Sequence, residues 1–429
     1  SDEPGQDQQE SLALAIESSW QLDSFDLKLI VGLADSDMEY GYDEDWTFAG
    51  IHPDGYMSRD NYIRDRKTQS LEFRFLSNDS SRLFSDSTDW LFGVYTLNSS
   101  ESLTREYTFL ASNFRSDYDF DTAAVFFQLD SSLSEKFTLE TGLRVERRDT
   151  IYRDSELLGF SPTETLWGGG VAAKYLLNSN TMAYASIARG YKAGGFNTDG
   201  TLDADLREFG EEFLVEYEMG IKSNLLENKL HLKAALFHDD RHEQQVKSST
   251  GRIRANGSTE FVDFIGNAAE GTNNGVEFEA VWTPSEQLGL TASLGLLDAT
   301  FDSFVNSENQ DLSGRDQAHA PGYMAHLAAD YNLGAWSLSV SLDAKDEFYF
   351  SDSHNVQSDP YELLNMNLSY SGEQWSLSFW GRNLTNQDYA VRGFFFGEFG
   401  NDPRKGYAPE PYVQYGEPRM VGVSYEVQL

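Results

Sequence analysis

The stretch FHDDRHEQQ carries side chains whose types and spacing could hold a metal ion. His238, Asp240 and His242 occupy alternate positions, so in a β-strand all three would lie on one face. Imidazole and carboxylate groups at this spacing could hold a metal ion or a haem iron. Two histidines beside carboxylates are also typical of a solvated strand end. We therefore assign no metal site and keep these three residues as the candidates for one.

The acidic stretch DMEYGYDEDW is a second place where a cation could bind. Its oxygen ligands for Ca²⁺ would be Asp37, Asp43, Glu44 and Asp45. The stretch lacks the ligand spacing and central glycine of an EF-hand loop. Calcium in acidic loops stays open as an interpretation.

A cationic, glycine-rich segment, RGYKAGGFN, follows one predicted strand. Arg189 and Lys192 could attract an anionic chelate, with Tyr191 and Asn197 beside them. Gly190, Gly194 and Gly195 permit bends that other residues resist. The alternative is that this segment shapes a loop and binds nothing.

An aromatic segment, RGFFFGEFG, lies in a long polar stretch near the end of the chain. Exposed aromatic clusters are costly unless they bind something or pack on a neighbouring loop. A catecholate or another flat ligand would suit them, and packing between loops is the alternative. The candidate ligand-binding residues here are Arg392, Phe394, Phe395, Phe396, Phe399 and Tyr407.

Several classes of function are disfavoured. The formal net charge of −38 argues against binding nucleic acid, because the phosphate backbone would be repelled. No hydrolase elbow, zinc-protease motif, phosphate loop or cysteine nucleophile stands out, so we expect no enzyme and no covalently bound cofactor. An outer-membrane hydrolase would be the enzyme alternative.

The elements that must position these residues read as β-strands. In VGVSYEVQL, apolar and polar residues alternate, as on a strand with one apolar face and one polar face. FDLKLIVGL, FTLETGLRVE and WSLSVSLDAK repeat the pattern, and no helical period of similar length occurs. Nothing approaches the roughly 20 consecutive apolar residues of a membrane-spanning helix. The chain reads as all-β, with antiparallel neighbours.

The connections between these strands alternate in length. Short turns include 178–180, 225–229, 283–287, 332–335 and 371–374, and Trp or Tyr residues flank several of them. The long polar connections lie at roughly 36–66, 192–212, 246–260, 302–320, 346–360 and 391–416. Short turns at one end, long loops at the other and aromatic girdles characterise bacterial outer-membrane barrels. We predict a transmembrane antiparallel up-and-down β-barrel in the outer membrane, with short periplasmic turns and long extracellular loops. A soluble β-rich binding protein is the alternative.

About 17 strands are expected, and their number is odd. The first runs toward a short turn at Trp20, so residue 1 is expected outside the cell and residue 429 in the periplasm. Single-chain bacterial barrels have an even number of strands. Because plugged transporters have about 22, we expect residues 1–429 to form a single barrel domain that is incomplete at its amino terminus, with no plug domain. The expected strands are 10–20, 24–36, 66–77, 88–98, 120–130, 135–150, 164–177, 180–190, 213–224, 229–245, 261–283, 287–302, 321–332, 335–350, 361–371, 374–389 and 417–429.

Charges of both signs are expected on the polar, inward face of the strands. They include Arg144, Glu146, Glu216, Lys233 and Glu277. One interpretation is a hydrated channel of mixed charge. The other is a wall that pairs with an inserted plug domain. The alternation alone leaves both open.

Four segments resemble conserved blocks of the TonB-dependent outer-membrane receptors, in the iron-complex and siderophore receptor branch. They are ARGYKAGGFN (188–197), GNAAEGTNNGVEFEAVW (266–282), GRNLTNQDY (381–389) and YGEPRMVGVSYEVQL (415–429), in the family's order and spacing. The chain departs from the family at SDEPGQDQQE, which matches neither plug nor coupling box, and at Leu429, where an aromatic residue is usual.

The resemblance implies uptake of a scarce large solute, most often a ferric siderophore or other iron complex. It implies energy from the TonB–ExbB–ExbD complex through a plug, which a second chain could supply together with the first strands. Outer-membrane lipid and lipopolysaccharide would surround the barrel of such a Gram-negative receptor. A passive channel or a structural surface barrel is the alternative function.

Overall fold

The computed structural model describes residues 4–428 apart from 46–47, 49, 52–54, 56, 199–201, 254–258, 307–308, 353, 397–402, 407 and 409. Within these residues, 17 strands of eight residues or more and the two-residue β7 (Gly159–Phe160) form one antiparallel sheet. The long strands are β1 Gln6–Gln21, β2 Asp26–Asp43, β3 Arg59–Leu76, β4 Thr88–Tyr107, β5 Phe114–Ser132, β6 Phe137–Asp154, β8 Thr163–Asn178, β9 Thr181–Lys192, β12 Glu212–Leu225, β13 Leu230–Ile253, β14 Thr259–Trp282, β15 Leu288–Phe304, β16 Tyr323–Leu333, β17 Trp336–Lys345, β18 Tyr361–Ser371, β19 Trp375–Arg382 and β22 Met420–Val427.

The remaining elements lie among the long connections. They are the strand pairs β10 (Gly195–Phe196) with β11 (Glu208–Phe209) and β20 (Ala390–Phe396) with β21 (Glu410–Tyr415), and two single-turn 3-10 helices, η1 (Ala204–Leu206) and η2 (Pro403–Lys405). No helix in the described ranges is long and apolar enough to cross a membrane.

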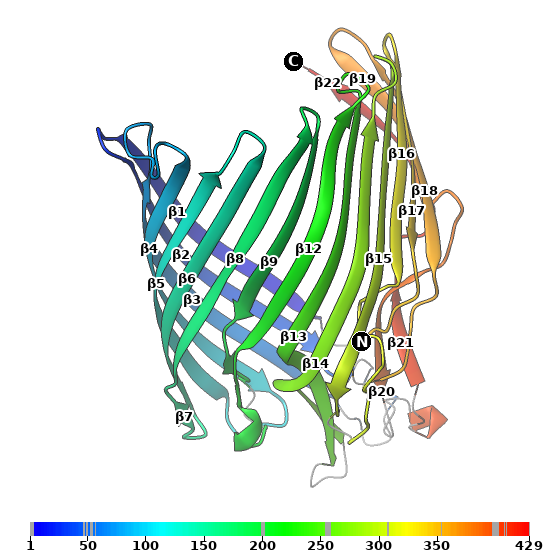
Figure 1. Ribbon diagram of the computed structural model, residues 1–429. Coiled ribbons are helices and arrows are strands. Elements are labelled where there is room, and N and C mark those ends of the chain that lie inside the picture. The colour runs from blue at the N-terminus through cyan, green and yellow to red at the C-terminus, as the bar shows by residue number, and fades with distance from the viewer. Residues whose placement is uncertain are drawn as a thin grey trace.

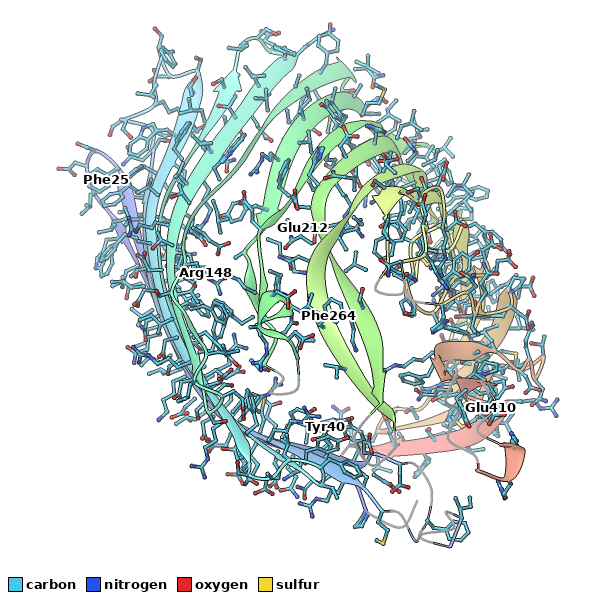
Figure 2. The ribbon with its side chains drawn as sticks, turned by 90° about the horizontal axis from the view of Figure 1, so that it is seen from below. Phe25, Tyr40, Arg148, Glu212, Phe264 and Glu410 are labelled. Atoms are coloured by element: carbon cyan, nitrogen blue, oxygen red, sulfur yellow. The ribbon has the colours of Figure 1, made fainter. Side chains whose placement is uncertain are left out.

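Each long strand pairs with its neighbours in chain order, so the sheet is an up-and-down meander. Its strands are tilted, and the sheet curls around a central space (Figures 1 and 2). Among the described residues, β1 pairs only with β2, and β22 only with β19, so these two edges do not close on each other. Because the number of long strands is odd, β1 and β22 run in the same direction. The prediction of about 17 antiparallel strands is confirmed.

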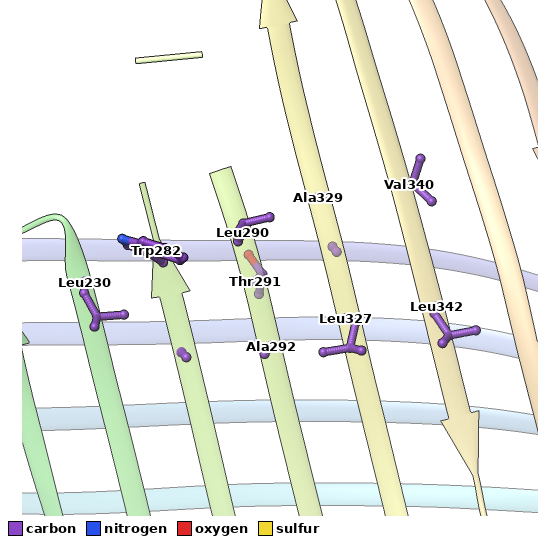
Figure 3. A pocket seen from close by; sticks show the side chains of 11 residues that line it. Leu230, Trp282, Leu290, Thr291, Ala292, Leu327, Ala329, Val340 and Leu342 are labelled. Atoms are coloured by element: carbon purple, nitrogen blue, oxygen red, sulfur yellow. The ribbon is translucent and has the colours of Figure 1, made fainter. Parts of the chain in front are cut away.

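Alternation separates the two faces of this sheet. Apolar side chains on the convex outer face are solvent-exposed, including Ile187, Leu294, Leu327 and Val423. A globular protein rarely exposes so large an apolar surface, whereas a membrane barrel needs it against lipid. The outer face also carries a shallow apolar groove of about 510 Å³ over β13–β17, where Ala280, Ala292 and Ala329 leave room between larger residues (Figure 3). The other lining residues are Leu230, Trp282, Leu290, Thr291, Leu327, Ala328, Val340 and Leu342.

Aromatic rings mark the end of the barrel with short turns. Trp336, Tyr370, Trp375 and Tyr425 form a continuous row across β17, β18, β19 and β22. Successive ring centroids are 5.0, 5.3 and 6.1 Å apart. This row is the predicted girdle, and it fixes the level of one membrane boundary.

Several expected boundaries were wrong. The strand expected at 66–77 begins at Arg59, and the one expected at 229–245 runs to Ile253, so the strands extend beyond the membrane and shorten the loops. The strand expected at 374–389 ends at Arg382, because Asn383 takes a left-handed φ of 47° and starts a turn. The expected strand at 417–429 is the shorter β22. The long connection 391–416 contains the β20–β21 hairpin.

Packing between the long connections gives their end of the barrel a small core of its own. Val246, Ala269, Phe301 and Phe304 are buried together, with Leu312 packed against them. These residues come from β13, β14, β15 and the connection after β15. This hydrophobic cluster therefore fixes the base of the connection after β15, and a fixed connection can position binding residues.

Candidate functional site

The RGYKAGGFN segment, predicted to bind ligand, sends its side chains in different directions. Arg189 is in register with Gly169 and Val215 on the outer face, where its guanidinium lies between the rings of Trp167 and Phe213. Lys192 is exposed, in register with Glu212. These two cations therefore do not converge on one inward-facing site.

Tyr191 reaches the inner face instead. Pairing between β8 and β9 stops at Gly169 and Arg189, and the Tyr191 ring lies against Gly168, where a Cβ would be 3.1 Å away. Its hydroxyl accepts a hydrogen bond from Arg144 Nε at 3.1 Å and donates one to Glu146 Oε2 at 3.2 Å. Arg144 also donates to Glu146. Tyr191 is thus part of a charged network on the inner wall.

Asn197 connects a loop to the barrel. Its side-chain amide donates to Leu206 O and Ile265 O, each at 2.8 Å, and its Oδ1 accepts from Ile265 N at 2.8 Å. Asn197 is buried, so all its polar atoms serve the fold. This supports the alternative that the segment shapes a loop.

The same loop is held by a buried ion pair that the sequence analysis missed. Arg207 Nη1 donates to Asp154 Oδ2 at 2.8 Å, and both side chains are almost completely buried. Arg207 Nε donates to Leu202 O at 3.0 Å. Beside the pair, the ring of Phe196 stacks on Tyr152, with centroids 5.1 Å apart. These contacts join residues far apart in the sequence, so no local pattern could have indicated them.

The aromatic segment after β19 forms part of the β20–β21 hairpin, separate from the main sheet. Arg392 and Phe394 share a face of β20, with the guanidinium 4.8 Å from the ring centroid. Gly393 is buried against Phe350 of the connection after β17. Phe395 and Phe396 belong to β20, and the placement of their side chains is not described. Phe399 and Tyr407 lie outside the described residues.

The histidine motif lies on the outer face of β13. His238 contacts Asn274 Oδ1 at 2.8 Å and Asp240 Oδ1 at 3.2 Å, while His242 contacts Glu270 Oε2 at 2.8 Å. His242 also stacks on Phe213, with ring centroids 4.7 Å apart. The ring nitrogens are therefore engaged separately, and the described residues contain no group of three or more potential ligands that could hold a metal.

The acidic stretch proposed for calcium is divided between two places. Asp37 is in register with Asp65, six residues before β2 ends at Asp43. Asp45 Oδ2 accepts from Ser58 N at 2.7 Å, and Glu44 Oε1 accepts from the Tyr107 hydroxyl at 3.2 Å. Asp43 is buried nearby. Within the described residues, these carboxylates form no group of three or more that could hold a metal ion.

A second network missed from the sequence links three strands and a loop. Arg241 donates to Glu212 Oε1 at 2.5 Å and to Gln317 Oε1 at 3.0 Å. Gln317 then donates to Asn273 Oδ1 at 3.1 Å. The network lies beside the small hydrophobic core and fixes the connection after β15 to β13 and β14. Glu212 lies on the inside of the curved sheet (Figure 2).

Carboxylates gather along the inner wall of β12–β14. Glu216 is in register with Asp239, and Glu277 follows on β14. Asp239 is 8% exposed, and its Oδ1 has no hydrogen-bond partner among the described residues. Lower on the same wall, Lys233 pairs with Glu279 at 3.0 Å. The described part of this wall therefore carries charges of both signs.

The connection after β17 is tied down by Arg315. Its guanidinium donates to Ser351 O at 2.8 Å and His354 O at 2.6 Å, and it lies 3.9 Å from the Tyr349 ring centroid. Val356 N donates to His354 Nδ1 at 3.2 Å. That bond needs an unprotonated Nδ1. The loop therefore depends on a neutral His354.

We expect this loop to loosen in acid. Burial, with a smaller contribution from Arg315, lowers the pKa of His354 from 6.5 to about 4. The unfolded segment takes up a proton at higher pH than the folded one, so the stabilisation is complete above pH 6.5 and is lost as the pH falls toward 4. Amide hydrogen exchange of residues 348–358, measured between pH 7.5 and 4.5 and corrected for intrinsic exchange rates, should show falling protection.

The control for this prediction is His354→Asn, which keeps an acceptor near the Nδ1 position and cannot titrate. Burial raises the pKa of Asp352. Protonation of that carboxyl stabilises the folded loop as the pH falls, so Asp352 opposes the effect of His354. The variant should therefore lose the decline in protection. An unchanged decline in His354→Asn would refute the assignment to this histidine.

Comparisons with known proteins agree with the geometry. A family model described as "TonB dependent receptor-like, beta-barrel" matches residues 2–384. The pesticin receptors of Yersinia pestis and Yersinia enterocolitica are each 24% identical over 323 residues, which cover 72% of this chain and 46% of the relative. This chain thus spans about half the length of these relatives.

Solved structures show the same fold. The ferric yersiniabactin uptake receptor FyuA from Yersinia pestis superposes with a TM-score of 0.77 at 18% identity, covering 98% of this chain and 61% of that one. The siderophore receptor PiuA from Acinetobacter baumannii gives 0.73 at 14% identity, covering 97% and 64%. With the match over residues 2–384, the chain belongs to the TonB-dependent receptor-like β-barrel family and is an integral barrel of the outer membrane of a Gram-negative bacterium.

Proposed function

We propose that this barrel takes up a ferric siderophore or another iron complex, and that the TonB–ExbB–ExbD complex supplies the energy. The family match over residues 2–384 carries the proposal. Relatives named as the pesticin receptor and as the ferric yersiniabactin uptake receptor support the substrate class. The iron complex is the cargo of the barrel and is not a resident cofactor.

The family match favours a coupled receptor over a passive channel. The inner wall suits that interpretation, because it presents exposed charges of both signs, among them Lys233 and Glu279, whose side chains are 57% and 47% exposed. Covering such charges is costly unless something pairs with them. A plug domain, either joined to this chain or brought by a second chain, would supply cationic and amide groups to this wall. TonB would act through that plug.

The loops would provide the ligand contacts. Arg392 and Phe394 share one face of the β20–β21 hairpin, where a cation beside an aromatic ring suits an anionic, flat chelate. The hydrogen bonds of Arg315 and Arg241 would hold the neighbouring loops in place. The binding-site proposal is thus restricted to the hairpin and does not include Arg189 or Asn197.

The test is uptake of ⁵⁵Fe-labelled siderophores of catecholate, citrate and thiazoline types by cells that depend on this protein. We expect accumulation of one class, and its loss on removal of TonB or on collapse of the proton gradient. Arg392→Ala with Phe394→Ala should weaken uptake, whereas Leu157→Ala, at a 94% exposed loop position, should not. Uptake independent of TonB, together with steady conductance in planar bilayers, would instead establish a passive channel.

A further inference from the structure

We propose that the outer face around Arg189 binds the phosphate of the outer-leaflet glycolipid, the phosphorylated glucosamine headgroup of lipid A. The site consists of Trp167, Arg189 and Phe213, on the adjacent strands β8, β9 and β12. It depends only on the membrane location of the barrel and not on what the barrel transports.

The position of Arg189 suits an amphiphilic partner. Immediately toward the short-turn end lies an apolar row of Val171, Ile187 and Tyr217, in register across the same three strands. These side chains are 50%, 54% and 44% exposed, as expected where acyl chains contact the barrel. Arg189 follows Ile187 by two residues on the same face. A lipid whose chains cover this row would carry its headgroup to the guanidinium.

The guanidinium is held in place by its neighbours. Its central carbon lies 4.3 Å from the centroids of both the Trp167 and the Phe213 rings, and Nη1 donates to the carbonyl of Trp167. Phe213 is supported in turn by stacking on His242, which contacts Glu270 at 2.8 Å. Rings on both sides leave the planar edge of the guanidinium as the surface for a ligand. That edge matches the paired oxygens of a phosphate.

Arg189 also remains available to an external anion, although Asp240 lies on the same face one strand beyond Val215. Arg147, another arginine on the outer face, is neutralised by Asp149 through two hydrogen bonds of 2.9 Å. Within the described residues, Arg189 forms no ion pair with a carboxylate. In a chain of net charge −38, a fixed cation without an acidic partner is notable. A lipid phosphate would provide the missing anion at the level where the apolar surface ends.

The experiment uses the protein purified from its outer membrane in detergent and stripped of lipid. Native mass spectrometry then measures binding of bisphosphorylated lipid A and of the same lipid after removal of its phosphates. Arg189→Gln should weaken binding of the phosphorylated lipid about tenfold, which corresponds to about 1.4 kcal/mol. Arg147→Gln is the matched control and should bind like the wild type, because Asp149 already occupies that guanidinium.

The phosphate and the arginine should depend on each other. Removing the phosphates should weaken binding to the wild type about tenfold and to Arg189→Gln hardly at all, the signature of a direct pair in a double-mutant cycle. Equal losses in both proteins, or unchanged binding by Arg189→Gln, would overturn the proposal. If Arg189→Gln does not assemble, the two lipids are compared on the wild type and on Arg189→Lys instead. The proposal requires that lipid A without its phosphates binds more weakly to the wild type than phosphorylated lipid A does.

Two further ligands separate the possible sources of phosphate. Inorganic phosphate at millimolar concentration should not displace lipid A, since it lacks chains for the apolar row. Vesicles of phosphatidylglycerol should compete poorly, because they offer a single phosphodiester. Efficient displacement by either one would refute the assignment to the glycolipid.

Discussion

Replacing Arg207 by alanine is expected to detach the segment 202–212 from the barrel, at a local cost of about 3–5 kcal/mol. Arg207 is 1% exposed, and the side chain of its partner Asp154 is completely buried. Removing the guanidinium leaves a carboxylate buried without its counter-charge, and Leu202 O loses a donor. Hydrogen exchange should show loss of protection in residues 202–212, while the barrel strands below keep theirs.

Two variants show whether charge or packing is responsible. Arg207→Met combined with Asp154→Asn removes both charges and keeps an acceptor for the backbone N–H groups of Glu156 and Leu158. It should recover much of the protection because no unpaired ion remains. Arg153→Ala removes an exposed neighbouring arginine and should change nothing measurable. If Arg207→Ala kept full protection of the segment, the ion pair would not be what holds the loop.

Most of the strands could be predicted because lipid and lumen impose opposite chemistry on alternate residues. That constraint ends at the membrane boundary, where both faces of a strand meet water. Arg59–Asp65 reads as a polar loop, yet it forms the beginning of β3 through pairing with β2 and β4. Backbone hydrogen bonds to the neighbouring strands extend β3 through these residues, and the sequence there has no alternation of apolar and polar residues that would indicate a strand.

The candidate site was predicted less well than the fold. Alternation from Ile187 already assigns Arg189 to the outer face, so its direction was accessible from the sequence. The role of Asn197 was not, because its partners on Ile265 are 68 residues away. The same holds for Arg207 with Asp154 and for Arg241 with Gln317. Such contacts form only after distant strands have been aligned by the barrel.

The assignment of faces leads to the second large effect, which concerns β15. Leu294 is on the outer face near the middle of the expected membrane span, in register with Phe278 and Ala325. Leu294→Arg should cost on the order of 2–4 kcal/mol, because the guanidinium would be in hydrocarbon. Ser293, one residue earlier, faces the inner wall in register with Glu279. Ser293→Arg should cost far less, since the guanidinium would be solvated in the lumen and would lie close to the Glu279 carboxylate.

This pair of variants controls for position as well as chemistry, because adjacent residues receive the same side chain at nearly the same depth. Reversible unfolding in urea with lipid vesicles, followed by tryptophan fluorescence, gives the free energy of each variant. Assembly in cells, measured as the heat-modifiable band on gels, should follow the same order. Because a one-residue slip exchanges the two faces of a strand, a larger cost for Ser293→Arg than for Leu294→Arg would mean that the sheet is curled with its apolar face inward. The lipid site at Arg189 and the charged lumen wall would then both be on the wrong side.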